Sequence, residues 1–420
     1  MERRVLVFLD LPAAGPQRVG TLWTRVRKGR ESGTFQYDPS WLERPDRFAL
    51  QPALTLDAGE HHTAPGKALF RALGDSAPDR WGRVLMRRAE RMAAKHEGRA
   101  PRTRFEIDYL LGVVDVARQG ALRFRLADDP DSPFLAAEGE GTTIPPLVEL
   151  SALLTATDRL EGDDISADQL RLLLAPGSSL GGARPKASVR DLDGHLAIAK
   201  FPHKSDDIDV VRWEGVALTL AQRAGITVPQ WRIESVDGRP VVLLRRFDRL
   251  GDQRVPFLSA MSMLGASDGE THSYLEFVDV LRQHGARPAE DMRELWRRIV
   301  YGVLISNTDD HLRNHGFLWA GEAGWTLSPA YDLNPVPIDL KPRVLSTAID
   351  LDSAEASFEL ALAVAEYFEL DAAAAAGIGR EVAEAVATWR DVAAQHGLPR
   401  EQVDRMESAF EHEDLQRAMG

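Results

Sequence analysis

The sequence contains no cysteine among its 420 residues. This absence excludes disulfides, zinc sites with thiolate ligands and cysteine nucleophiles, and it agrees with a reducing compartment. No run approaches the 18 apolar residues that suggest a transmembrane helix, and the apolar stretch from Val5 to Leu9 is only as long as a strand. We therefore expect a cytoplasmic protein with neither an export signal nor a membrane span.

Positive charge is also in deficit, with 51 lysines and arginines against 64 aspartates and glutamates and a net charge of −13. This excess of negative charge opposes non-specific binding of the chain to nucleic acid, so we expect any association with DNA to depend on a partner. Hydrophobic residues make up 44% of the chain, enough for a substantial core, and the length suggests two or three domains or subdomains.

The most informative stretch is 307–314, which reads Asn-Thr-Asp-Asp-His-Leu-Arg-Asn and follows the apolar run 299–305. Asp309 precedes Asn314 by five positions, and Asp332 comes eighteen residues after Asn314. Protein-kinase catalytic loops use this spacing: the first aspartate accepts or orients the substrate hydroxyl, and the asparagine and later aspartate hold Mg²⁺. The spacing alone also describes a polar loop that caps a helix, because Asp and Asn are common turn residues.

Residues 177–186, Gly-Ser-Ser-Leu-Gly-Gly-Ala-Arg-Pro-Lys, form a glycine-rich turn whose backbone N–H groups can approach phosphate closely. The stretch is neither a Walker A loop nor a strict G-x-G-x-x-G, so on its own it is a weak signal. The strand expected at 195–201 contains Lys200, whose ammonium is costly to bury unless anions such as ATP phosphates meet it. The alternative is a lysine that snorkels from the strand end.

A helical pattern over 210–218 presents Glu214 as the carboxylate that could pair with Lys200, and a solvated helix glutamate is the alternative. The order of glycine loop, strand lysine, helix glutamate, Asp/Asn pair and final aspartate is hard to obtain by chance. We therefore predict a kinase-like phosphotransferase in which positioning and charge neutralisation carry the catalysis.

Together these motifs resemble the HipA family, the serine/threonine protein kinase toxins of bacterial type II toxin–antitoxin systems. The resemblance runs from about residue 19 to about residue 335. It rests on segments 178–186, 199–202, 245–249, 307–314 and 327–333, and on N-terminal segments 19–23, 35–38, 41–42 and 75–83. Segment 75–83 contains the element Asp-x-x-Pro-Asp-x-Trp-Gly, and Asp310 stands where some members carry glycine.

The resemblance implies that the chain transfers the γ-phosphoryl group of ATP, with Mg²⁺, to a serine or threonine of a protein substrate. Aminoacyl-tRNA synthetases are the best-known substrate class of the family. The resemblance also implies a small helix-turn-helix antitoxin (HipB-like) through which DNA would be bound only indirectly. In the family a serine seven residues before the loop lysine is autophosphorylated, and this offset from Lys186 gives Ser179, with Ser178 adjacent.

The expected site has Asp309 as the base or hydroxyl-orienting group and Asn314 and Asp332 as the ligands of Mg²⁺. The residues expected to contact ATP are Ser179, Leu180, Gly181, Gly182, Ala183, Lys186, Lys200, Arg245, Arg246, Phe247, His311, Asn314, Tyr331 and Asp332. Among them, Gly181 and Gly182 would offer backbone N–H groups to phosphate. The backbone of 245–247 would read adenine, and His311 would shape the loop or touch phosphate.

The pattern along the chain predicts an α+β protein with a two-lobed, protein-kinase-like (HipA-like) fold. Strands are expected at 3–9, 19–27, 33–37, 230–236 and 239–245, and helices at 78–96, 147–158, 166–174, 273–285, 288–305, 353–370, 371–396 and 399–418. The predicted domains are a small strand-rich N-terminal subdomain (1–105), a kinase N-lobe with the glycine loop (106–247) and an all-helical C-lobe (248–420).

Two other functions use the same residues. One is a small-molecule phosphotransferase on the same lobes, although the sequence has no extra pocket motif. The other is a binding module that docks an antitoxin as co-repressor, with kinase activity secondary. All catalytic positions are filled, which argues against an inactive kinase.

Overall fold

The computed structural model describes residues 2–12, 14–129, 131, 133–136, 143–162, 164–177, 182 and 184–420. Contacts divide the chain into two compact units, Met1–Lys204 with Ser235–Leu258, and Ser205–Glu234 with Ser259–Gly420. The domain boundaries at 105 and 247 stay a prediction. Among the described residues, no helix combines the length and the apolar character that crossing a bilayer requires.

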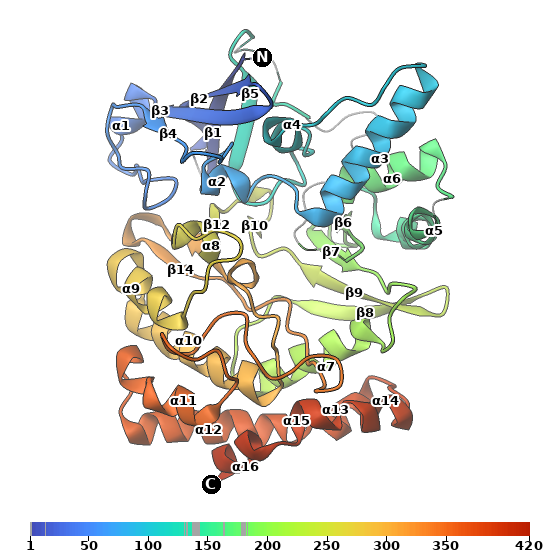
Figure 1. Cartoon of the computed structure of the whole chain (residues 1–420), viewed down its shortest axis with the longest axis vertical. Coiled ribbons are helices and arrows are strands. Elements are labelled where there is room, and N and C mark those ends of the chain that lie inside the picture. The colour runs from blue at the N-terminus through green and yellow to red at the C-terminus, as the bar shows by residue number, and fades with distance from the viewer. Residues whose placement is uncertain are drawn as a thin grey trace. The chain divides into compact units, whose positions relative to one another are not determined.

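The first unit begins with a five-stranded antiparallel sheet of order β4-β3-β2-β1-β5 (Figure 1). Its strands are β1 (Glu2–Leu11), β2 (Gly15–Arg27), β3 (Arg30–Tyr37), β4 (His61–His62) and β5 (Leu122–Leu126). Alternate side chains are buried along β3, as expected for a sheet with one face on a core. The three strands predicted before residue 40 are confirmed. Short helices α1 (Pro39–Leu42) and α2 (Arg71–Gly74) follow in the connections.

A second sheet, of order β6-β7-β9-β8, carries the glycine-loop region. Its strands are β6 (Lys186–Arg190), β7 (Leu196–Lys200), β9 (Arg239–Arg245) and β8 (Trp231–Val236). Within β8 the chain passes from the second unit to the first, between Glu234 and Ser235. The turn before β9 is made by Asp237 and Gly238, both with positive φ, as the Asp-Gly pair predicts. The strand predictions here are confirmed.

Helices α3 (Arg80–His96), α5 (Leu150–Glu161) and α6 (Ala167–Gly177) share one core with this sheet. The first unit also contains α4 (Glu106–Leu111) and the 3-10 turn η1 (Leu147–Glu149). Trp81 and Leu85 of α3, Leu153 of α5 and Leu173 of α6 pack with Val189 of β6 in a buried cluster. Figure 1 shows α3 and α6 side by side within this unit.

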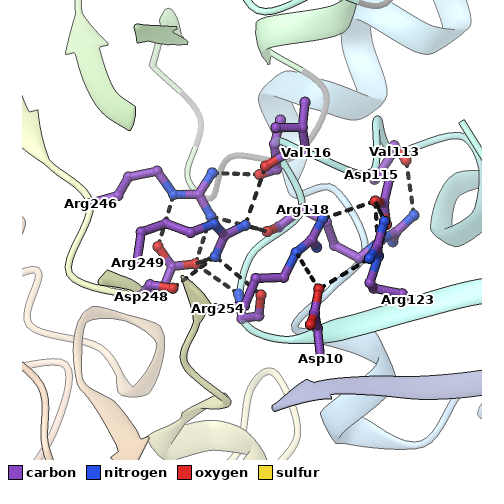
Figure 2. Close-up of polar contacts among 12 residues, drawn as sticks. Asp10, Val113, Asp115, Val116, Arg118, Arg123, Arg246, Asp248, Arg249 and Arg254 are labelled. Carbon is purple, nitrogen blue, oxygen red and sulfur yellow. Dashed lines mark hydrogen bonds and ion pairs between the residues drawn. The ribbon is translucent and has the colours of Figure 1, made fainter. Parts of the chain in front are cut away.

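A buried cluster of arginines and aspartates joins three distant segments of the first unit (Figure 2). Its charged members are Asp10, Asp115, Arg118, Arg123, Arg246, Asp248, Arg249 and Arg254, the last two from the small hairpin of β10 (Arg249–Leu250) and β11 (Gln253–Arg254). Asp248 accepts from Arg246 at 2.6 Å, from Arg249 at 2.9 Å and from the Gly120 N–H at 2.8 Å.

Backbone carbonyls supply the remaining negative partners of this cluster. Arg118 donates to the carbonyls of Ser76, Leu110 and Val113, and Arg249 donates to those of Val116 and Gly120. Burial opposes ionisation of Asp248, but Arg246 and Arg249 hold its pKa well below the ordinary range. Burial lowers the pKa of Arg118, and the nearby charge of Asp115 opposes this lowering.

The second unit is mainly helical and is built around α10 (Pro288–Leu304). Its other helical elements are α7 (Val210–Arg223), α8 (Ala260–Met263), α9 (Tyr274–His284), η2 (Leu312–Asn314), η3 (Gly321–Ala323), α11 (Phe358–Ala363), η4 (Ala365–Phe368), α12 (Ala372–Val386), α13 (Trp389–Gln395), α14 (Arg400–Arg405), α15 (Glu407–Phe410) and α16 (Glu413–Met419). Trp296 of α10 donates to the Ala361 carbonyl at 3.0 Å, and the Tyr301 hydroxyl donates to that of Ala217 at 2.5 Å.

The C-terminal part was predicted to be all-helical, and this detail is corrected by a small sheet. It has the order β12-β13-β14, with β12 (Phe257–Ser259), β13 (Gly316–Trp319) and β14 (Trp325–Leu327). Residues 317–319 of β13 pair with residues 325–327 of β14, and the five residues 320–324 join the two strands, with Gly324 at positive φ. Strands this short leave too little alternation to identify from a single sequence.

Three long helices predicted near the C-terminus are also interrupted. The helix predicted at 353–370 begins only at Phe358, because Asp350 accepts from two backbone N–H groups in a turn and Ser357 caps the helix. The helix predicted at 371–396 breaks at Thr388, whose hydroxyl donates to the Ala385 carbonyl at 2.7 Å. The helix predicted at 399–418 is three short helices, where Phe410 stacks on Trp389 at 4.6 Å.

Replacing Asp248 by asparagine should destabilise the protein by about 3–5 kcal/mol, because buried arginines lose their compensating charge while side-chain volume is kept. Chemical denaturation at neutral pH measures this loss. The folded-state pKa of Asp248 lies below the unfolded value, so its stabilisation is present above about pH 4 and is lost as the pH falls through the folded pKa. The exposed Asp252 of the same hairpin gives the control variant, Asp252→Asn, and equal stability of the two variants contradicts the prediction.

Candidate active site

The loop that contains Asp309 begins where α10 ends, in a C-terminal motif closed by backbone hydrogen bonds. The Asn307 N–H donates to the Gly302 carbonyl at 2.8 Å and the Ser306 N–H to that of Val303 at 3.2 Å, the two bonds of a Schellman motif. Ser306 occupies the left-handed position with φ 52°, where glycine is usual. Its buried hydroxyl donates to the Ala409 carbonyl at 2.9 Å, which holds the serine there.

Asp309 lies at the surface of this loop, and its side chain is 67% exposed. Its backbone is fixed, because its carbonyl accepts from the His311 N–H at 2.9 Å and from the Asn314 side-chain nitrogen at 3.0 Å. The predicted Asp309–Asn314 pair is therefore joined directly. With the amide nitrogen used in this way, the Asn314 oxygen is the side-chain atom that suits a hard cation.

A second segment, 331–336, runs along the first and brings Asp332 to it. The Tyr331 hydroxyl donates to the Arg313 carbonyl at 2.8 Å, the Asn334 N–H to the Asn307 side chain at 3.3 Å, and the Val336 N–H to the Ser306 carbonyl at 3.2 Å. Asp332 has φ 55°, a left-handed conformation that aspartate adopts more readily than most residues. The hydrogen bond from Tyr331 to Arg313 joins the two segments. Asp332 directly follows Tyr331 in the chain, and Asn314 directly follows Arg313.

Lys341 is a part of this loop that sequence reasoning missed. Its ammonium lies 3.4 Å from a carboxylate oxygen of Asp309 and 3.3 Å from the Thr308 carbonyl. That carbonyl also accepts from the Ser346 hydroxyl at 3.0 Å. Nothing in the surrounding sequence marks Lys341 as part of the candidate site. Only its contact with Asp309 in the folded chain does so.

Asp310 has the opposite environment from its neighbour Asp309. It is buried, and it accepts from the Tyr274 hydroxyl at 2.5 Å and lies 3.1 Å from a ring nitrogen of His315. Burial alone would raise the pKa of Asp310, but His315 and the Tyr274 hydrogen bond hold it below the ordinary value. Asp310 is therefore an anchor of the loop. Its role was missed because adjacent aspartates look alike in a sequence.

In the first unit, the two predicted phosphate-binding lysines are direct neighbours. Lys186 of β6 and Lys200 of β7 face each other in the antiparallel register, with Lys186 buried and Lys200 half-buried. Glu214 is buried on α7 of the other unit, and its pairing with Lys200 stays a prediction. Ser179, Leu180, Gly181 and Ala183 lie outside the described residues, as does the alternative Ser178.

Two backbone groups of residues assigned to ATP make hydrogen bonds within the protein. The Gly182 N–H donates to the Asp79 carboxylate at 2.9 Å, so it does not serve as a phosphate donor in this structure. The Arg246 N–H donates to the Leu196 carbonyl at 3.0 Å as part of the sheet edge, and its side chain enters the buried arginine cluster. The adenine assignment to the backbone of 245–247 stays a prediction.

Comparison with known proteins places this arrangement in a family. Residues 13–107 match the model of the HipA N-terminal domain, and residues 178–390, just over half of the chain, match that of the HipA-like C-terminal domain. The chain belongs to the HipA family. The resemblance drawn from the motifs is confirmed.

Relatives of this HipA-family chain include proteins named as kinases. "Putative kinase Y4mE" of Sinorhizobium fredii is 26% identical over 340 residues, which cover 74% of each chain. A "Putative kinase" of Haemophilus influenzae is 24% identical over 195 residues, 41% of this chain and 56% of the relative. A chain in the solved complex of Shewanella oneidensis MR-1 HipA, HipB and operator DNA has a TM-score of 0.63 at 14% identity and covers 99% of this chain and 96% of that one. This likeness confirms the predicted α+β, HipA-like fold.

Tyr274→Phe should destabilise the protein by about 1.5–3 kcal/mol, because the buried Asp310 carboxylate loses its hydroxyl donor while the ring stays in place. Urea denaturation measures the difference from the wild type. Tyr367→Phe is the matched control, since Tyr367 is 49% exposed. If both variants unfold at the same urea concentration, Tyr274 does not anchor the loop as inferred.

Proposed function

We propose that the chain is an ATP-dependent serine/threonine protein kinase. The observation that carries this proposal is the bracing of the loop 306–314 by the segment 331–336, which sets Asp309, Asn314 and Asp332 on two joined segments of a HipA-family chain. The hydroxyl of the substrate would approach the exposed Asp309 carboxylate, which orients it and takes its proton as the phosphoryl group is transferred.

The donor set fits magnesium, because an amide oxygen and a carboxylate are the hard ligands that this ion prefers. Asn314 and Asp332 would hold Mg²⁺, which when bound neutralises the charge of the phosphates. Lys341 lies against Asp309 and would help to direct that carboxylate toward solvent, where a substrate hydroxyl arrives.

The facing lysines of β6 and β7 support a phosphate-binding role for the first unit. Lys186 and Lys200 are paired across the β6–β7 ladder, so their side chains leave the sheet on the same face, where one anion could meet both charges. Lys186, Lys200 and the glycine loop are therefore proposed to bind the phosphates of ATP.

The proposed biological setting is a toxin–antitoxin pair. Family membership supports a protein substrate from the translation machinery, such as an aminoacyl-tRNA synthetase. The solved complex of the Shewanella relative contains HipB and operator DNA, which supports a HipB-like helix-turn-helix antitoxin as partner. The net charge of −13 fits DNA contact through that partner.

Asp309→Asn should lower phosphate transfer from labelled ATP, into the protein itself and into a cell extract, by roughly 10²–10⁴-fold. The variant should retain Mg-ATP binding, whereas Asp332→Asn should lose metal-dependent nucleotide binding. Asparagine also adopts the left-handed conformation of Asp332, so this second variant tests the charge rather than the backbone. The exposed Asp352→Asn serves as control, and wild-type transfer rates in Asp309→Asn and Asp332→Asn overturn the kinase assignment.

Autophosphorylation at Ser179 is proposed as self-inhibition. A phosphoserine adds about −1.5 to −2 charges where ATP phosphates would bind, so the modified protein should bind ATP poorly. Intact-mass measurement after incubation with Mg-ATP should show one added phosphate on the wild type and little on Ser179→Ala. Phosphate retained by Ser179→Ala but lost from Ser178→Ala moves the site to the neighbouring serine, and no added phosphate on the wild type refutes the mechanism.

A further inference from the structure

The last described part of the glycine loop is attached to the start of α3, more than one hundred residues earlier in the chain. Gly182 makes two hydrogen bonds there: its N–H donates to the Asp79 carboxylate at 2.9 Å, and its carbonyl accepts from the Trp81 N–H at 3.1 Å. These bonds hold the N–H and the carbonyl of Gly182 in place. Gly182 has φ 80°, so this geometry depends on glycine.

The Trp81 side chain reaches the two ends of the same loop. Its indole N–H donates to the Lys186 carbonyl at 2.8 Å. Gly177, the last residue of α6 before the loop, lies so close that a Cβ there would stand 3.1 Å from the indole nitrogen and 2.6 Å from Leu85. The loop therefore begins and ends against Trp81, which is buried in the core of the first unit.

The contacts also explain an unusual feature of α3. Asp79 occupies the N-cap position, but its side chain does not cap its own helix. The Trp81 N–H is one of the first N–H groups of a helix, which have no partner within it, and the Gly182 carbonyl takes this bond instead. The helix start and the loop end thus satisfy each other's backbone groups.

The two hydrogen bonds from Gly182 to Asp79 and Trp81 form a clamp, and the start of α3 that carries this clamp is itself fixed. Arg83, one turn into α3, donates to the Pro78 carbonyl at 2.8 Å and to both carboxylate oxygens of Glu106 at 2.6 Å. A bidentate pair of this kind restricts both position and orientation. Pro78, which precedes Asp79, and Arg83, which follows it, are therefore fixed in place. Asp79 and Trp81 in turn fix Gly182.

We propose that Asp79 and Trp81 are positioning residues for nucleotide binding, which gives the N-terminal domain a direct role in the phosphate site. The clamp sets Gly182 beneath the Lys186 ammonium, which would lie 2.7 Å from a Cβ placed on Gly182. Loop and lysine are thereby arranged before ATP arrives, and less ordering remains for the binding step. This inference rests on the proposed function, since it assigns a role at the same phosphate site.

Asp79→Ala tests the proposal through binding rather than folding. The dissociation constant of Mg-ATP and the KM for ATP should rise roughly 10- to 100-fold, the effect of losing a hydrogen bond to a charged group, while kcat at saturating ATP changes little. Asp79→Asn should restore most of the affinity, because the amide oxygen can accept from the Gly182 N–H. Trp81→Phe, which keeps a ring in the core but loses the indole donor, should weaken binding roughly 2- to 10-fold.

Asp168→Ala provides the control on α6, because Asp168 is 91% exposed and pairs only locally with Arg171. Unchanged affinity in Asp79→Ala overturns the proposal. Tighter binding also overturns it, since that result means that the Asp79 carboxylate competes with phosphate for Gly182. A wild-type protein that neither binds nor uses ATP refutes the kinase function itself, so the two failures are distinguishable.

Discussion

Buried positive charge is the constraint on which the architecture of the first unit depends. Five arginines meet only three aspartates in the cluster of Figure 2, so the balance must come from backbone carbonyls. The segment 113–120 has little regular structure, and its carbonyls turn inward to meet Arg118, Arg246 and Arg249. Neither the guanidinium groups nor these carbonyls could be buried alone, because an unpaired polar group is costly in the interior. The irregular segment and the strand end at Arg246 therefore hold each other in place.

In the second unit, the loop 306–314 exposes the Asp309 carboxylate on a backbone that hydrogen bonds fix. Adjacent aspartates divide these tasks. Asp310 is buried and held by Tyr274 and His315, whereas Asp309 extends into solvent from a backbone that Asn314 and His311 fix. Ser306 reverses the chain in a conformation that costs energy, and its buried hydrogen bonds stabilise it there. The strained Ser306 and the buried Asp310 thus lie close in the chain to the exposed Asp309.

Sequence patterns predicted what local chemistry determines. Alternation identified the N-terminal strands, Asp237-Gly238 identified a turn, and the Asp309–Asn314 spacing identified two residues that the structure joins. What the patterns missed depends on partners far along the chain. The direction of the Arg246 side chain follows from carbonyls at 117 and 118, the contact of Lys341 from a loop thirty residues away, and the helix break at Thr388 from packing around Trp389. Propensity gives no information on such contacts.

The attachment of Gly182 to Asp79 and Trp81 also bears on how the chain is made. Synthesis at about 5–20 residues per second leaves roughly 5–20 s between emergence of Trp81 and of its loop partners. During that interval the indole and the apolar side of α3 lack the α5, α6 and β6 residues that bury them. The nascent N-terminal domain therefore exposes this apolar surface until those residues have been synthesised. The contacts of Trp81 with Gly182 and Lys186 therefore cannot form until nearly half of the chain has emerged.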